Sequence, residues 1–131
     1  MSAANPQAKQ LNEALYALSH FFNMATNENG GGARAAAMLL LGLYNGPRFP
    51  FDLTDLRLFD ESNLNLAIAL LRFDARPAME VHDWLNKLYG RNDFGARFEQ
   101  LAHDWRVKGR CKKEWLQPLE RIGMLQIGGA A

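Results

Sequence analysis

Cysteine is nearly absent from this sequence, and so are long hydrophobic runs and any excess of charge of one sign. Cys111, the single cysteine among 131 residues, cannot form an intramolecular disulfide, so we expect a reducing, cytoplasmic location. Residues 1–10 lack the basic start and apolar run of a secretory signal. The most apolar stretch, residues 35–44, is far shorter than the roughly 20 residues that cross a bilayer as a helix. We therefore expect no membrane association.

The charges nearly cancel, because 15 Lys and Arg face 14 Asp and Glu for a net charge of +1. A balance of this kind argues against a surface that binds nucleic acid or anionic lipid over its whole area. The distribution is less even, since residues 1–80 carry net −2 and residues 81–131 carry net +3. With 48% hydrophobic and 22% charged residues, the composition is that of a folded, soluble domain and excludes a disordered tail.

Hydrophobic residues recur with the period of an α-helix along most of the chain. The pattern predicts an all-α protein, a compact bundle of five to six helices, with a short C-terminal β-strand at residues 124–127 as the one alternative to helix. We expect a single domain over residues 1–131, in which residues 107–131 form a basic segment, a helix and a tail. The expected helices are 6–25, 33–45, a short one within 52–59, 60–75, 77–89, 93–105 and 111–121.

Several residues predict where these helices begin, end and face the core. Asp52 and Asp60 precede helical segments and are expected to cap them. Pro77 is expected in the first turn of its helix, where a missing N–H costs nothing, and Gly90 is expected to end that helix. Ile68 falls on the apolar stripe of the 60–75 helix and is expected to be buried.

Three blocks carry a resemblance to a family of small bacterial proteins. They are residues 31–45 (GGARAAAMLLLGLYN), residues 51–56 (FDLTDL) with Asp60, and residues 98–106, which end in Trp-Arg. The family is of unassigned function and recurs among accessory genes of integrative and conjugative elements in proteobacteria. The resemblance covers roughly residues 30–106 and implies a mobile-element setting. It implies no catalytic residues, because the family has none assigned.

An acidic edge surrounds the 51–56 block. Capping accounts for Asp52 and Asp60, whereas folding does not account for Asp55 and Glu61. We therefore predict that Asp55 and Glu61, with Arg57 between them, contact a basic surface of a protein partner. Plain solvation explains the same residues equally well.

A basic segment follows residue 105, with Arg106, Lys108, Arg110, Lys112 and Lys113. Read as part of a winged helix-turn-helix over residues 97–127, these cations would contact DNA phosphates and base edges at the start of a helix 111–121. Pro118 argues against this interpretation, because it would kink that helix. The alternative is a solvated connector followed by a helix that packs on the bundle.

Candidate chemistry is sparse. The triplets 82–84 and 103–105 both read His-Asp-Trp, but metal-dependent phosphohydrolases need a further His and Asp in an order that only His20 and Asp104 could complete. Cys111 lies among cations that could activate its thiol, although no histidine is near. Residues 29–32 (Asn-Gly-Gly-Gly) precede a helix but lack the lysine and hydroxyl of a phosphate loop. We predict no catalytic residue, metal or cofactor.

The function that these features favour is non-enzymatic. We expect a macromolecule-binding accessory protein of a bacterial mobile genetic element, a regulator or inhibitor that acts by protein–protein contact. The alternative is a DNA-binding regulator that uses residues 97–127, as a homodimer because one helix contacts few phosphates.

Overall fold

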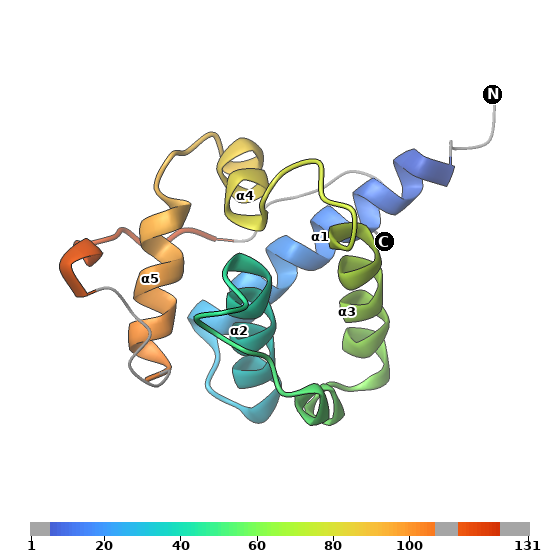
Figure 1. The fold of residues 1–131 in the computed structure, drawn as a ribbon, viewed down its shortest axis with the longest axis horizontal. Helices are drawn as coiled ribbons and strands as arrows, with labels where there is room; N and C mark the ends of the chain where they lie inside the picture. The colour runs from blue at the N-terminus through green and yellow to red at the C-terminus, as the bar shows by residue number, and fades with distance from the viewer. Residues whose placement is uncertain (1–5, 107–112, 124–131) are drawn as a thin grey trace.

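A computed structural model describes residues 6–106 and 113–123 of the chain. Within these ranges every regular element is a helix, which confirms the all-α prediction (Figure 1). The strand predicted at residues 124–127 lies outside the described residues. The elements are α1 (Pro6–Asn27), α2 (Gly31–Tyr44), the 3₁₀ helix η1 (Leu53–Leu58), α3 (Glu61–Asp74), α4 (Val81–Tyr89), α5 (Phe94–Asp104) and the 3₁₀ helix η2 (Lys113–Trp115).

The longest helix, α1, is the support on which the others assemble. Its apolar stripe includes Leu15, Leu18, Phe21 and Phe22, all of them buried. Both α2 and α3 pack along α1, whereas they barely touch each other. The α4–α5 pair packs on α2, and α5 lies on the opposite side of the molecule from α3 (Figure 1). The buried side chains of these helices form one continuous core.

Burial in α2 is extensive, as expected for a helix at the centre of a bundle. Its alanines and leucines at positions 33, 35–37 and 39–41 are all at most 2% exposed. At Gly42 the following chain comes so close that an added Cβ would lie 3.2 Å from the Cβ of Phe51. Glycine at this position therefore lets the connector fold back across α2.

Aromatic rings join the elements across the core. The Phe22 ring of α1 lies 5.0 Å from that of Phe94 and 6.1 Å from that of Phe98, both in α5. On the other side, the Phe21 ring lies 5.2 Å from the ring of Phe59, which follows η1. These separations are typical of favourable aromatic pairs, which contribute beyond the area they bury.

Four local predictions are wrong. The second helix begins at Gly31 and not at residue 33, and Pro77 lies in the loop before α4, which begins at Val81. Ile68 is 44% exposed, because α3 buries Ala67 and Leu70 against its main neighbour, α1. The helix predicted at 111–121 is absent from its described part: residues 113–115 form η2 and residues 116–123 are irregular.

Among the described residues no helix combines the length and apolar character that a bilayer crossing requires.

Candidate functional site

The acidic edge, Asp52, Asp55, Asp60 and Glu61, lies along η1 and the start of α3. The Asp52 carboxylate accepts hydrogen bonds from the Thr54 backbone N–H at 2.9 Å and from its hydroxyl at 2.8 Å. These bonds hold the pKa of Asp52 below its usual value. Asp60 accepts from the Asn63 N–H at 2.8 Å. Both residues are therefore helix caps, as predicted.

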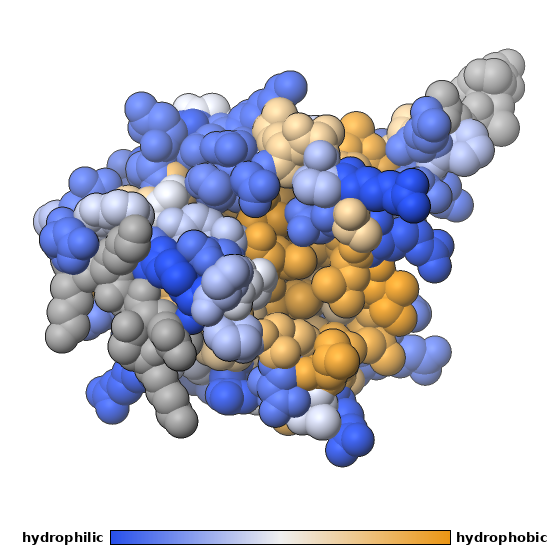
Figure 2. Space-filling model, in the orientation of Figure 1, coloured by the Kyte–Doolittle hydropathy of each residue, from blue (hydrophilic) through white to orange (hydrophobic). Residues whose placement is uncertain are grey.

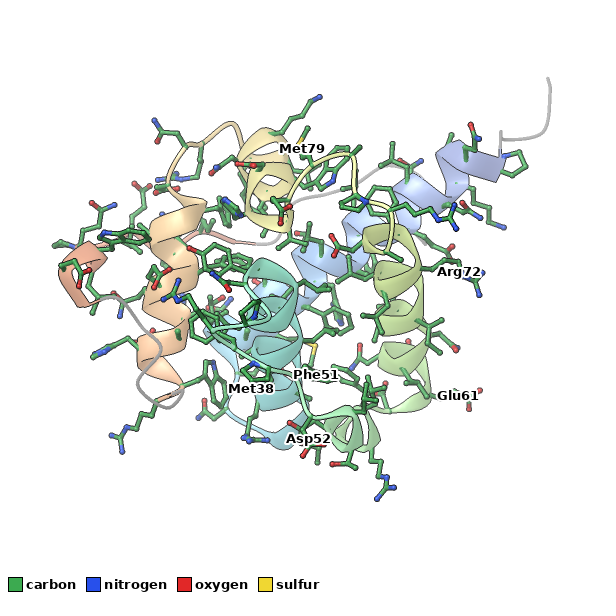
Figure 3. The ribbon with its side chains drawn as sticks, in the orientation of Figure 1. Met38, Phe51, Asp52, Glu61, Arg72 and Met79 are labelled. Carbon is green, nitrogen blue, oxygen red and sulfur yellow. The ribbon has the colours of Figure 1, made fainter. Side chains whose placement is uncertain are left out.

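The three predicted partner-binding residues differ in how exposed their side chains are. Asp55 is only 18% exposed, and its carboxylate lies 3.4 Å from the guanidinium of Arg34 in α2. Folding therefore does account for part of its role, through a neighbour that only the tertiary structure supplies. Arg57 and Glu61 are exposed, in the last turn of η1 and the first turn of α3. Figure 3 shows Glu61 on the outer side of α3, near Asp52.

Exposed apolar side chains adjoin this edge. Leu53 is 73% exposed, Leu58 44% and Ile68 44%, and they belong to η1 and α3. Half-buried Met38 lies on the outer side of α2, and Phe51 lies between α2 and α3 (Figure 3). Figure 2 shows apolar surface gathered over α2, η1 and α3 on this side of the molecule. We call these five residues the apolar face.

The apolar face exists because of how the helices are placed. It lies where α2 and α3 both pack on α1 but make few close backbone contacts with each other. Contiguous exposed apolar surface with a polar margin is typical of sites that bind other macromolecules. The sequence indicated the acidic edge but not the apolar face, although Leu53 stands within the 51–56 block and Leu58 follows it by two positions.

A buried carboxylate lies at the other end of α2. Glu99 of α5 is completely buried and accepts bidentate hydrogen bonds from Arg48, at 2.7 and 2.8 Å. The Tyr44 hydroxyl donates to the same carboxylate at 2.7 Å. Burial, followed by the contact with Glu99, raises the pKa of Tyr44 to about 12. This cluster fastens the 45–50 connector to α5 and leaves no readily transferable proton on Tyr44 at neutral pH.

The histidines of the chain's His-Asp-Trp triplets point to different places. His82 packs its ring against Tyr44, 5.0 Å away, whereas His103 is exposed near the end of α5. His20 bonds Asn63 at 2.8 Å. Over residues 6–106 and 113–123, no group of three or more His, Cys, Asp or Glu side chains is placed to hold a metal ion. The tryptophans of the two triplets pack against the body of the molecule. Trp84 lies on Phe73, and the Trp105 indole N–H donates to the Ala25 carbonyl at 2.9 Å.

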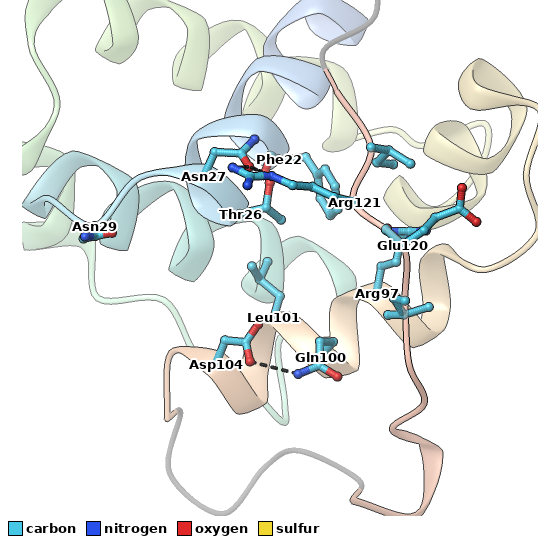
Figure 4. A pocket seen from close by; sticks show the side chains of 12 residues that line it. Phe22, Thr26, Asn27, Asn29, Arg97, Gln100, Leu101, Asp104, Glu120 and Arg121 are labelled. Atoms are coloured by element: carbon cyan, nitrogen blue, oxygen red, sulfur yellow. Dashed lines mark hydrogen bonds between the residues drawn. The ribbon is translucent and has the colours of Figure 1, made fainter.

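The basic segment is described only at its ends. Arg106 is exposed and has a φ of 54°, and Lys113 begins η2. Lys108, Arg110, Lys112 and Cys111 lie outside the described residues. Residues 116–123, which we call the C-terminal strap, run as an irregular segment against the end of α1 and the side of α5 (Figure 4). The predicted winged helix-turn-helix therefore lacks its second helix in this described stretch, where Pro118 interrupts the helical pattern.

A cavity of about 350 Å³ opens beneath the strap. Phe22 and Leu101 contribute apolar surface to it, and Arg97, Gln100 and Asp104 contribute polar surface (Figure 4). The last two bond each other at 2.8 Å. Within residues 29–32, Asn29 and Gly30 belong to the connection between α1 and α2, whereas Gly31 and Gly32 are already helical. Of this stretch only Asn29 lines the cavity.

Comparison with known proteins gives a single family. The model of a family of unknown function (DUF7673) matches residues 15–106. No curated protein and no solved structure matches the chain. The matched range contains α1 from its third turn, the apolar face and the Glu99 cluster, and it ends before the C-terminal strap.

Proposed function

We infer that this chain, which belongs to the DUF7673 family of unknown function, works by binding another protein through its apolar face and acidic edge. The observation that supports this proposal is the exposure of Leu53, Leu58 and Ile68 next to exposed Glu61 and Arg57. An apolar centre with a charged margin is the usual composition of a protein interface. The surface lies within the residues that the family model matches, so the proposal extends to the family.

The chemistry of the surface indicates the kind of partner. Leu53 and Leu58 project from one short 3₁₀ helix, which offers a compact hydrophobic anchor. Asp52, Asp60 and Glu61 place three carboxylates around it, the first two of them as helix caps. A partner that presents aliphatic side chains flanked by Lys or Arg fits this arrangement. We further propose that the binding serves a bacterial mobile genetic element, as a regulator or inhibitor.

Two matched variants test the surface. Leu53→Glu with Leu58→Glu places charge at the proposed centre, and Trp115→Glu makes the same change at a side chain that is 49% exposed in another part of the molecule. Affinity purification from host lysate is expected to recover a partner with the unmodified chain and with W115E, and to lose it with the double variant. Asp55→Lys with Glu61→Lys is expected to weaken recovery severalfold. A partner that all four proteins retain equally would refute this choice of surface.

DNA binding through residues 97–127 stays a prediction with less support, because the helix it requires is not formed at residues 116–123. A salt titration with duplex DNA separates the two functions. Binding that falls steeply with salt, and that Lys112→Glu with Lys113→Glu abolishes, would favour the DNA-binding alternative. We expect no duplex to be held at about 50 mM salt, a condition that favours phosphate contacts.

A further inference from the structure

The C-terminal strap lies like a bound peptide. It has no regular secondary structure, and its described contacts are with side chains far away in the sequence. The Glu120 carboxylate meets the Arg91 guanidinium at 3.0 Å, and the Glu120 carbonyl accepts from Arg97 Nη1 at 2.7 Å. Arg121 donates to the Asn27 side-chain oxygen at 2.6 and 2.9 Å. Ile122 packs against the hydrophobic core.

The groove beneath the strap is built by the body of the molecule. Arg91 and Arg97 are positioned by Asp93, which pairs with both at 3.1 Å. The Arg91 hydrogen bond is the largest cause that lowers the pKa of Asp93, to about 2. The two cations are therefore held in place by a residue outside the strap and face the segment that crosses them.

The strap fits this groove incompletely. It leaves the cavity of about 350 Å³ between itself, α1 and α5. Arg97 is only 6% exposed, and its Nε is buried with no hydrogen-bond partner among the described residues. An unpaired buried donor weakens the closed arrangement. The family match also ends at Arg106, so Arg91, Arg97 and Asp93 lie inside the family region and the strap lies outside it.

We propose that the groove between the end of α1 and the side of α5 is a binding site for an extended peptide, and that the C-terminal strap occupies it in cis. The partner peptide carries an acidic residue followed two positions later by an aliphatic one, as Glu120 and Ile122 do. The acidic side chain pairs with Arg91, its carbonyl accepts from Arg97, and the aliphatic side chain takes the place of Ile122. This site is separate from the apolar face and does not depend on the function proposed for that face.

The test uses the full chain and a fluorescein-labelled peptide with the sequence of residues 113–123. In the variant Leu119→Asp with Ile122→Asp the strap loses its apolar contacts, and the groove is expected to accept the peptide in trans. Because the tethered strap competes at a high effective concentration in the unmodified chain, fluorescence anisotropy should show binding to the variant that is tighter by at least about tenfold. A peptide with Ile122→Asp serves as the control and is expected not to bind.

A charge exchange distinguishes recognition from a merely structural role. Arg91→Glu, added to the strap variant, is expected to lose the original peptide and to bind a peptide with Glu120→Arg. Equal binding of original and control peptides, or no gain over the unmodified chain, would overturn the proposal.

If the strap variant does not fold, hydrogen exchange on the unmodified chain provides a second test. The amides of residues 119–122 are expected to exchange faster than those of Phe98 and Leu101, through opening of the strap alone. Exchange of both groups at one common rate would show that the strap opens only with global unfolding, which contradicts a displaceable occupant.

Discussion

At the scale of single residues, Glu99 stands out because its carboxylate is fully buried. It pairs with the Arg48 guanidinium at 2.7 Å. Glu99→Gln keeps the shape of the side chain but removes the buried charge from this pair, so we expect a loss of about 3 kcal/mol in the free energy of unfolding. Urea denaturation measures the loss. Glu61→Gln, a change at an exposed carboxylate, is the control and should stay within about 0.5 kcal/mol.

Asp74 gives the stability of the fold a pH dependence. Burial, followed by repulsion from Glu80, raises the pKa of Asp74 from 3.8 to about 6. The folded state therefore binds the proton more tightly than the unfolded state, and stability falls as pH rises from about 4 to about 6. Asp74→Asn should match the unmodified chain at pH 4 and exceed it by about 1 kcal/mol at pH 7, after allowance for solvent screening. A difference in stability between the two proteins that is the same at pH 4 and pH 7 would contradict this account.

What the sequence could predict at this scale depends on distance along the chain. The caps Asp52 and Asp60 were predictable because each carboxylate bonds a backbone N–H within three residues. Arg48 and Glu99 are 51 positions apart in the sequence, and no local pattern indicates that they pair. The only signal was an acid directly after Phe98 on an apolar stripe. Asp55 was misjudged for the same reason, since its partner Arg34 lies 21 positions away.

At the scale of elements, two glycines near the α4–α5 turn predict opposite responses to alanine. Gly90 ends α4 with a φ of 63°, a conformation that costs an L-residue about 1 kcal/mol, so Gly90→Ala should destabilise the protein by about that amount. Gly95 is inside α5, and a Cβ there would meet only the His82 ring, at 4.0 Å. Gly95→Ala should stabilise by up to about 1 kcal/mol. Thermal melts of the two variants give the signs, and two shifts of the same sign would contradict the argument.

Helix boundaries were predicted best where one residue dictates the backbone. Gly90 ended its helix as expected. Proline was less informative, because Pro77 suits both the first turn of a helix and a loop. It lies in a loop, since the buried stripe of α4 begins only at Val81. Apolar spacing suggested a helix over residues 111–121, but Pro118 opposed it. Over residues 116–121 the chain is irregular instead, and Glu120 and Arg121 make contacts with distant residues there.

At the scale of the whole molecule, the apolar face is expected to contribute little to folding. Leu53 is 73% exposed, so Leu53→Ser removes little buried area. We expect the free energy of unfolding to change by no more than about 0.5 kcal/mol, the usual range for surface substitutions. Binding of a hydrophobic dye such as anilinonaphthalene sulfonate to the folded protein should fall. A large loss of stability with unchanged dye binding would show that the Leu53 side chain serves the core.

Helix positions along the chain follow from periodicity, but the pairing of helices does not. The stripe of α3 was predicted to include Ile68 as though the helix had neighbours on two sides, whereas α1 is its main one. The apolar face could not be predicted for this reason. It depends on the separation between α2 and α3, which neither sequence segment indicates by itself. The fold class was predictable from local pattern, and the candidate site required the tertiary arrangement.

The shared support of α2 and α3 also has a mechanical consequence. Two helices that each rest on α1, without being packed against one another, can shift by small sliding movements over that support while the close-packed contacts below them persist. Such a movement would change the width of the surface between them. A partner bound to the apolar face would determine that width, so the same fold could accommodate side chains of different size without rearrangement of its core.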